Sequence, residues 1–169
     1  MVKTRIRVPL RYLPTKLTKR DKKKEGKMLM KSKRLYKKGK YYTRKTISSF
    51  KSKPSSHIKD AERIYNISSV TPNKELANKT GCSIAALKKI VNKGEGAYFS
   101  SGSRPNQTAQ SWGLARLASS ITAGKSAAVD FDILDKGCDH KKKAFILAQK
   151  SRRKYKYGHS ATRKTSISL

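Results

Sequence analysis

Cationic and aromatic side chains alternate closely at residues 40–45, where the order is Lys-Tyr-Tyr-Thr-Arg-Lys. Lysine and arginine attract phosphates and acidic protein surfaces, and a neighbouring tyrosine can stack on a base or fill a pocket of a partner. A loop packed over its own core would carry the same residues, so both interpretations stay open. The chemistry that this stretch suggests is non-covalent binding of an anionic partner.

Residues 76–90 have the spacing of two short helices joined by a glycine turn. The small Ala77 would let the helices cross closely, and Gly81 would adopt the left-handed conformation of the turn. Leu87 and Ile90 would then pack the inner face of the second helix. Because any two helices joined in this way produce this spacing, a DNA-binding helix-turn-helix is only one of two interpretations.

The second of these helices would begin at Ser83 and present its outer face to a major groove. The side chains on that face are Ala85, Ala86, Lys88 and Lys89. Two alanines without arginine or asparagine argue against extensive recognition of base edges. The candidate surface of the helix pair is therefore Ser83, Lys88 and Lys89.

The serine- and glycine-rich stretch 94–107 contains a candidate anion seat. Ser100, Ser101 and Arg104 precede a predicted helix N-terminus, where backbone N–H groups favour an anion. Neither standard phosphate loop is present, because position 99 is Phe where a dinucleotide loop needs its third glycine, and no Gly-Lys-Ser/Thr follows. A structural turn is the alternative that we favour for this stretch.

Residue types that support catalysis or metal binding are present but poorly arranged. Cys82 and Cys138 indicate no disulfide framework, and Cys138-Asp139-His140 lacks the second close pair that a zinc site needs. The carboxylate cluster comprises Asp130, Asp132, Asp135 and Asp139. A divalent-ion or general-acid site is one interpretation of it, and we favour the other, an acidic patch that pairs with basic segments. We therefore expect no enzyme, cofactor, metal or small-molecule substrate.

The charge of the chain explains why binding to an anion is expected. The 169 residues contain 42 Lys and Arg against 10 Asp and Glu, a formal charge of +32. Such self-repulsion argues against an isolated soluble enzyme, unless anions screen it. No apolar stretch approaches the roughly 20 residues of a membrane span, and we expect no secretory signal.

The charge also divides the chain into three predicted parts. Residues 1–53 carry +19, residues 54–140 only +3, and residues 141–169 carry +10. Lysine outnumbers arginine by 30 to 12, and this hydrated point charge suits attraction to phosphates regardless of sequence. The predicted domains are a basic arm with a basic helix, a near-neutral helical core, and a basic C-terminal helix with a tail.

The elements that must position these residues are mainly helices. Apolar and cationic residues alternate over 2–12, which predicts a strand that Pro9 restricts to a sheet edge or a free arm. Helices are expected over 19–37, from Ser55 or Ser56, and over 71–81, 83–94, 108–124, 127–136 and 141–156, followed by an unstructured tail from Gly158. The predicted fold is mainly α: a small domain with the helix-turn-helix-like pair, flanked by extended basic N- and C-terminal arms.

The two arms are where we expect partners to bind. Arms that become ordered only on assembly lose entropy at that moment, but they can tie several partners together. The side chains expected to make these contacts are Lys3, Arg5, Arg7, Arg11, Lys22, Lys23, Lys24, Lys40, Tyr41, Tyr42, Arg44, Lys45, Arg152, Arg153 and Lys154.

Three strings of residues, at 80–87, 98–108 and 111–119, carry a resemblance to a known family. Within the stretch from Lys37 to Cys138, they resemble an uncharacterised domain in proteins of large double-stranded DNA viruses of algae and protists, chloroviruses among them. With the basic N-terminal arm, the resemblance covers most of the chain. It implies a viral protein made in bulk and brings no established activity or catalytic residues.

The charge pattern and the resemblance together predict a non-enzymatic structural virion protein. We expect a minor capsid protein on the inner face of the shell, whose helical middle docks between capsomers while the arms staple major and minor capsid proteins. The alternative is a sequence-independent DNA-binding or DNA-condensing protein of the virion core. Duplex DNA and an anionic inner-membrane surface are thus further candidate partners, and before assembly the protein would lie in the host cell's virus factory.

Overall fold

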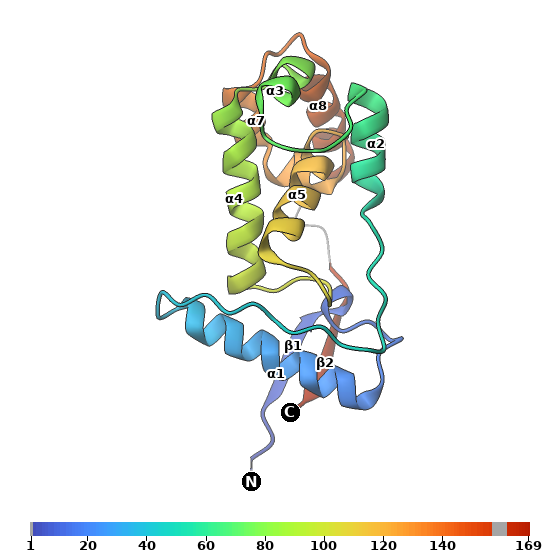
Figure 1. The fold of residues 1–169 in the computed structure, drawn as a ribbon, viewed down its shortest axis with the longest axis vertical. Coiled ribbons are helices and arrows are strands. Elements are labelled where there is room, and N and C mark those ends of the chain that lie inside the picture. The colour runs from blue at the N-terminus through green and yellow to red at the C-terminus, as the bar shows by residue number, and fades with distance from the viewer. Residues whose placement is uncertain (1, 157–161) are drawn as a thin grey trace. The chain divides into compact units, whose positions relative to one another are not determined.

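The computed structural model describes residues 2–156 and 162–169, and within them the chain is mainly helical with one small sheet (Figure 1). The strands are β1 (Arg5–Pro9) and β2 (Lys164–Ser168), and a 3-10 helix, η1 (Leu10–Tyr12), follows β1. The described α-helices are α1 (Lys19–Tyr36), α2 (Ser56–Tyr65), α3 (Lys74–Thr80), α4 (Ile84–Ser100), α5 (Ala109–Ser120), α6 (Lys125–Val129), α7 (Phe131–Gly137) and α8 (Lys143–Tyr155). The predicted mainly helical class is confirmed.

The chain forms two compact units, which we describe separately. Unit 1 combines Met1–Lys53, Glu95–Trp112 and Ala161–Leu169, and unit 2 combines Pro54–Gly94 and Gly113–Ser160. The change of charge predicted after residue 53 coincides with a boundary between the units. Unit 1, however, also draws on the middle of the chain and on its C-terminal end.

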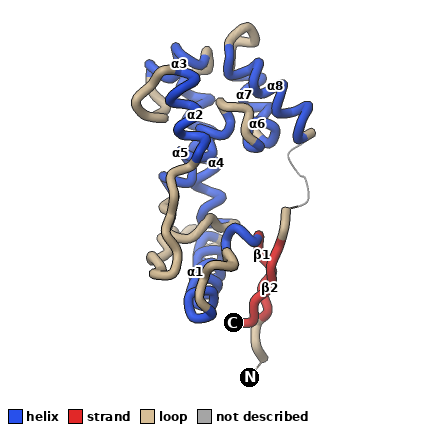
Figure 2. The backbone as a smooth tube through the Cα atoms, turned by 90° about the vertical axis from the view of Figure 1, so that its right-hand side faces the viewer, coloured by secondary structure: helices blue, strands red, loops and turns tan. Residues whose placement is uncertain are grey.

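The sheet of unit 1 joins the two ends of the chain. Strands β1 and β2 pair antiparallel, with Ile6 opposite Ile167 and Arg7 opposite Ser166, so the termini lie near one another in Figure 2. The expectation of free extended arms is therefore wrong for the described residues, and so is the unstructured tail at Lys164–Ser168; residues 157–161 lie outside the described part. The alternation of residues 2–12 correctly indicates a strand, but pairing across such a long sequence separation leaves no local signal.

Helix α1 packs against this sheet through a glycine. A Cβ at Gly26 would lie 2.8 Å from Leu169 Cδ2 and 3.4 Å from Ile6 Cδ1, so the missing side chain lets the strands approach the helix. Thr18 begins the helix as expected, since its hydroxyl accepts the Asp21 N–H at 3.1 Å. The buried apolar core of unit 1 is small: Tyr12, Leu13, Leu17, Met28, Leu29 and Ile47.

Unit 2 has a larger apolar core built from α2 to α8. Leu87, Ile90, Leu117, Ile121 and Leu134 are completely buried in it. Buried alanines let the helices pack closely; they are Ala61, Ala118, Ala127, Ala144 and Ala148. The inward positions predicted for Leu87 and Ile90 are confirmed.

Helix α4 does not end at Gly94, as the sequence suggested, but continues to Ser100. Gly94 instead lets α4 and α5 pack closely where they cross, because a Cβ at this position would lie only 2.6 Å from the Cα of Gly113 in α5. The stretch predicted as a loop over 94–107 is thus shortened to residues 101–108, between α4 and α5.

The two cysteines form a disulfide, contrary to the sequence-based expectation. Cys82 lies in the turn between α3 and α4, and Cys138 follows α7. Backbone hydrogen bonds join the same turns: Ser83 N–H donates to the Gly137 carbonyl at 2.8 Å, and Asp139 N–H donates to the Gly81 carbonyl at 2.7 Å. Two cysteines carry no framework pattern, so only the fold reveals that these turns meet.

Candidate anion-binding surface

Unit 1 carries most of the charge of the chain. Its three segments contain 24 Lys and Arg against three acidic residues, a formal charge of +21. Two of the acids, Asp21 and Glu25, are buried on α1, and the third, Glu95, is half-buried. The surface of unit 1 therefore presents cations with almost no opposing carboxylate, an arrangement that attracts polyanions.

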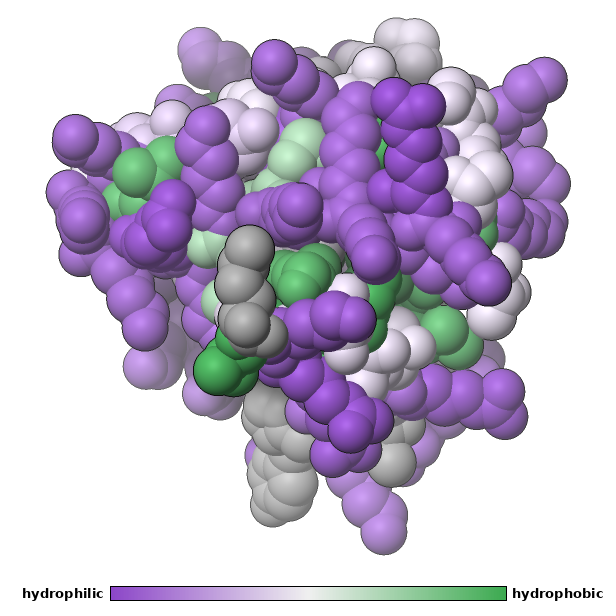
Figure 3. Space-filling view, turned by 90° about the horizontal axis from the view of Figure 1, so that it is seen from below, coloured by the Kyte–Doolittle hydropathy of each residue, from purple (hydrophilic) through white to green (hydrophobic). Residues whose placement is uncertain are grey.

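Half of the residues of α1 are cations, and they cover its outer side. The exposed ones are Lys19, Arg20, Lys23, Lys24, Lys27, Lys31, Lys33 and Arg34, with Lys22 half-buried. The helix is about 27 Å long at about 1.5 Å per residue, so it carries on average one cation for about every 3 Å of its length, a charge density that attracts a polyanion. The face of the molecule that holds α1 and the sheet is covered mainly by hydrophilic side chains (Figure 3).

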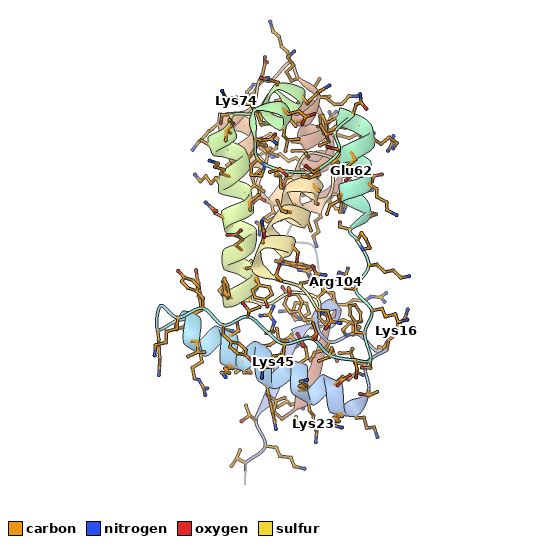
Figure 4. The ribbon with its side chains drawn as sticks, in the orientation of Figure 1. Lys16, Lys23, Lys45, Glu62, Lys74 and Arg104 are labelled. Atoms are coloured by element: carbon orange, nitrogen blue, oxygen red, sulfur yellow. A yellow bond between two sulfur atoms is a disulfide. The ribbon has the colours of Figure 1, made fainter. Side chains whose placement is uncertain are left out.

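Residues 40–53, here called the strap, run antiparallel to α1. Tyr42 lies under Lys31, whose Nζ is 4.4 Å from the ring centre, and Ser49 N–H donates to Asp21 Oδ2 at 2.9 Å near the other end of the helix. Hydrogen bonds from the side chain and backbone of Ser49 lower the pKa of Asp21. The strap adds four exposed lysines to the surface of α1: Lys40, Lys45, Lys51 and Lys53. Figure 4 marks Lys23 on α1 and Lys45 on the strap.

Arg44, predicted to bind a partner, is instead buried at the centre of unit 1, with 6% of its area exposed. Its Nη1 donates to the Tyr98 carbonyl at 2.8 Å and its Nη2 to Ser103 Oγ at 2.7 Å. The guanidinium lies 3.8 Å from the centre of the Tyr98 ring, and its Nε is 3.6 Å from Glu25 Oε1. Arg44 therefore holds the strap in place and is removed from the candidate surface.

Glu25 is the acidic partner in this buried cluster. Burial raises its pKa to about 7, although the nearby Arg44 and Lys24 charges oppose the rise. Neither carboxylate oxygen has a hydrogen-bond partner among the described residues, and burial also lowers the pKa of Arg44. Burying this ion pair therefore costs folding free energy. It also places the negative charge of Glu25 in the interior, away from the outer side of α1.

The side chain of Asn106 fixes the middle of the strap by forming hydrogen bonds with its backbone, as a neighbouring β-strand would. Its Oδ1 accepts the Ile47 N–H at 2.8 Å, and its Nδ2 donates to the carbonyls of Ile47 and Phe50. Asn106 has a positive φ of 60°, a conformation that asparagine tolerates. The strap is therefore a held, extended segment rather than a free arm.

The remaining N-terminal candidates do lie at the surface. Lys3, Arg5, Arg7 and Arg11 are exposed, and Arg5 and Arg7 lie on β1 opposite the small residues Ser168 and Ser166 of β2. Tyr41 is 73% exposed, whereas Tyr42 is half-buried, with Lys31 of α1 over its ring. Most of the predicted N-terminal set is thus brought to one folded unit.

Arg152, Arg153 and Lys154, the C-terminal candidates, belong to unit 2. All three are exposed on the last turn of α8, and the Arg152 guanidinium lies 4.3 Å from the centre of the Phe131 ring. They are a separate cationic group on a helix whose other face is buried in the core of unit 2.

The α3–α4 pair has the predicted turn but a partly covered second helix. Gly81 is left-handed, with φ of +78°, and Ser83 begins α4 by accepting the Ala86 N–H at 3.1 Å. Ser83, Lys88 and Lys89 are exposed as predicted. Ala86 is not: it is 7% exposed because it packs against Gly137, where a Cβ would collide with it. The end of α7, at Gly137, therefore covers part of the first turns of α4 and leaves less of that helix open to a DNA groove.

The predicted anion seat is not supported. Ser100 ends α4, so Ser100 and Ser101 lie at the carbonyl end of a helix, where the dipole repels anions. Arg104 is exposed (labelled in Figure 4), while its neighbour Ser103 is buried and accepts a hydrogen bond from Arg44. The error follows from ending the helix at Gly94.

The acidic cluster is also divided by the fold. Asp130 is buried, and Arg116 donates to both its oxygens at 2.8 Å while Lys93 donates at 3.0 Å. Burial raises the pKa of Asp130, but these hydrogen bonds and charges outweigh it and lower the pKa overall. Asp132, Asp135 and Asp139 are exposed. In the described part of the chain, no three His, Cys, Asp or Glu side chains are grouped to hold a metal ion.

Comparisons with known proteins place the chain in a family without assigning it an activity. A family model described as "Family of unknown function (DUF5824)" matches residues 9–137. No curated protein matches the chain, and no solved structure does. Among the described helices, none is both long and apolar enough to cross a membrane.

Proposed function

This chain belongs to the family of unknown function DUF5824, and we propose that it is a non-enzymatic structural protein that binds nucleic-acid phosphates without sequence preference. The observation that carries the proposal is the outer side of α1 with the strap. There, exposed lysines and arginines follow one another along a rigid helix, while Asp21 and Glu25 are buried beneath them. Such a dense, almost unopposed positive surface favours a polyanion as its partner.

The composition of unit 1 favours nucleic acid over a protein partner. A standard protein interface buries about 800 Å² per partner and has an apolar centre. Among the described residues of unit 1, the exposed large apolar side chains are only Val2, Met30, Tyr36 and Tyr41. In the described residues, β1 and β2 pair with each other, which favours a fixed cationic surface over two independently extended staples.

The resemblance to proteins of large DNA viruses suggests where such a protein would act. We propose a place in the virion between the genome and the inner face of the shell. Unit 2 is then the part suited to capsid proteins, since its charge is only +11 and Ile146 and Val129 are exposed on it, at 51% and 37%. Unit 1 would face the nucleic acid.

Salt dependence of binding tests this function. With about eight phosphate contacts, the logarithm of the affinity for duplex DNA falls with the logarithm of salt at a slope of about −7. The variant Lys19→Gln/Lys23→Gln/Lys27→Gln removes one exposed stripe of α1 and is expected to bring the slope to about −4. A slope near zero for the unchanged protein would refute the proposal.

A matched variant in unit 2 distinguishes the two cationic surfaces. Lys79→Gln/Lys88→Gln/Lys89→Gln removes three exposed lysines around the α3–α4 pair and is expected to leave most of the slope in place. If this variant loses binding while the α1 variant does not, the helix pair contacts the DNA and the assignment to unit 1 is wrong.

A further inference from the structure

Three aromatic rings meet at the surface where α1 passes into the strap. Tyr41 is 73% exposed, and its ring centre lies 5.1 Å from that of Phe99 and 6.2 Å from that of Tyr36. The rings of Tyr36 and Phe99 are nearly parallel, at 9°, with centres 6.3 Å apart. We call these three residues the aromatic shelf.

The backbone turn at the end of α1 positions the shelf. Gly39 adopts a left-handed conformation, with φ of +72°. Its N–H donates to the Tyr36 carbonyl at 3.0 Å, and the Lys40 N–H donates to the Leu35 carbonyl at 2.9 Å. The chain therefore reverses within a few residues and returns Tyr41 to the side of Tyr36.

Contacts with α1 and with Tyr98 hold Phe99, the half-buried ring of the aromatic shelf, in place. Ser32 on α1 donates its hydroxyl to the Phe99 carbonyl at 3.0 Å, and the ring of Phe99 meets that of the buried Tyr98 edge-on, with centres 5.1 Å apart. Tyr98 is itself fixed by its contacts with Arg44. A ligand that stacks on the shelf thus meets rings that are already ordered, which lowers the entropic cost of binding.

Exposed lysines lie next to Tyr41 in the sequence. Lys37, Lys38 and Lys40 are all exposed within four residues of Tyr41. The acidic residue nearest in sequence to any of the three rings is Glu95, which lies one turn before Phe99 on α4 and is half-buried. An aromatic surface bordered by lysines matches a ligand that has both a flat ring and a phosphate.

We propose that the aromatic shelf binds an unpaired base of single-stranded nucleic acid, with Tyr41 as the stacking ring and the neighbouring lysines on the adjacent phosphates. This proposal rests on the nucleic-acid function proposed above and adds the form of the ligand. Bases of a duplex are stacked on one another and closed to a side chain, whereas every unpaired base offers a face to an aromatic ring.

The test compares Tyr41→Ala with the unchanged protein, using a 20-nucleotide oligothymidine and a duplex of the same length in fluorescence anisotropy. Stacking on one base accounts for a roughly five- to hundredfold change in affinity, so we expect a loss in that range for the single strand. Duplex affinity should change less than twofold. The salt slope should also stay constant, because no charge is removed.

Two further variants make the outcome decisive. Tyr41→Phe keeps the ring and should retain single-strand affinity within about twofold, while Lys40→Gln should weaken both ligands modestly and reduce the salt slope by about 0.7 to 0.9. Unchanged single-strand binding by Tyr41→Ala, or an equal loss for both ligands, overturns the stacking site but leaves the phosphate function standing. If the unchanged protein binds neither ligand, the proposed function itself fails.

Discussion

Units 1 and 2 are stabilised in different ways. Unit 2 buries nineteen residues in one apolar cluster and adds a disulfide between two turns. Unit 1 buries six residues in its apolar cluster and holds its strap through polar contacts made by Arg44, Asn106 and Asp21. Unit 1 also carries the larger positive charge, +21 against +11.

The comparison shows which unit is built to depend on its surroundings. Unit 2 has the larger apolar core and the smaller charge, so screening by salt is expected to change its stability less than that of unit 1. In unit 1, charge repulsion opposes a small core, and bound anions would relieve it. A ligand that binds only the folded form stabilises it further, so the proposed phosphate binding would be linked to the folding of unit 1.

The largest expected effect comes from removing the buried cation of unit 1. Arg44→Met leaves Glu25 buried without its partner and is expected to cost about 3–5 kcal/mol. The single tryptophan, Trp112, packs on the core of unit 1, so its fluorescence in a urea titration measures this unit. Far-UV circular dichroism should show that the helices of unit 2 persist after unit 1 unfolds.

Two further variants serve as controls for Arg44→Met. Lys45→Met removes an exposed neighbouring cation and should change stability by less than about 0.5 kcal/mol. Arg44→Met/Glu25→Leu replaces both charges with apolar groups and should recover part of the loss. If Arg44→Met unfolds no more easily than Lys45→Met, the polar centre does not stabilise unit 1.

Glu25 in unit 1 and Asp130 in unit 2 should contribute pH dependences of opposite sign. Glu25 has an ordinary pKa of 4.5 and one of about 7 in the folded protein, so folded unit 1 holds this proton more tightly than the unfolded chain. Its stability should therefore fall as the pH rises from about 4.5 to 7, by about 3 kcal/mol for a shift of this size. Trp112 fluorescence in urea, at a series of pH values, measures the change.

Asp130 gives the reverse dependence in unit 2. Its pKa in the folded protein lies below the ordinary value of 3.8, so its contribution is present above that pH and is lost as the pH falls further. Glu25→Gln should abolish most of the pH dependence of unit 1 between about pH 4.5 and 7, where Asp21, with its lowered pKa, stays ionised. It should leave the pH dependence of unit 2, followed by far-UV circular dichroism, unchanged. A pH dependence of unit 1 that survives this substitution would show that another group is responsible.

The sequence predicts local structure well in both units and predicts contacts poorly. Thr18, Ser55 and Gly81 mark helix ends correctly, because capping depends on neighbouring residues alone. The stripe of Leu87 and Ile90 identifies a buried face for the same reason. Residue type and spacing over a few positions are sufficient for such features.

Contacts between distant segments explain the errors. Arg44 looks like a surface cation in a basic run, and only its meeting with Glu25 and Tyr98 shows that it is buried. Gly94 looks like a helix end until Gly113 is found beside it. In unit 1, where charge dominates the composition, nothing in the sequence distinguishes Glu25, the carboxylate of α1 that faces Arg44, from any other acidic residue.

Two helical glycines provide the smallest and most closely matched test of the comparison. At Gly94 in unit 2, an added Cβ would meet the backbone of Gly113 at 2.6 Å, and backbone cannot move without separating α4 from α5. Gly94→Ala should therefore cost unit 2 about 1–3 kcal/mol, measured by far-UV circular dichroism in a urea titration. At Gly26 in unit 1, the Cβ would meet the tip of Leu169 at 2.8 Å, which can rotate away. Alanine also favours a helix interior over glycine by about 0.5–1 kcal/mol, so Gly26→Ala should be neutral within about 0.5 kcal/mol in a urea titration followed by Trp112 fluorescence. An equal cost at both positions would mean that the sheet of unit 1 packs on α1 as rigidly as the helices of unit 2 pack together, and the distinction between the two units would then rest on their charges alone.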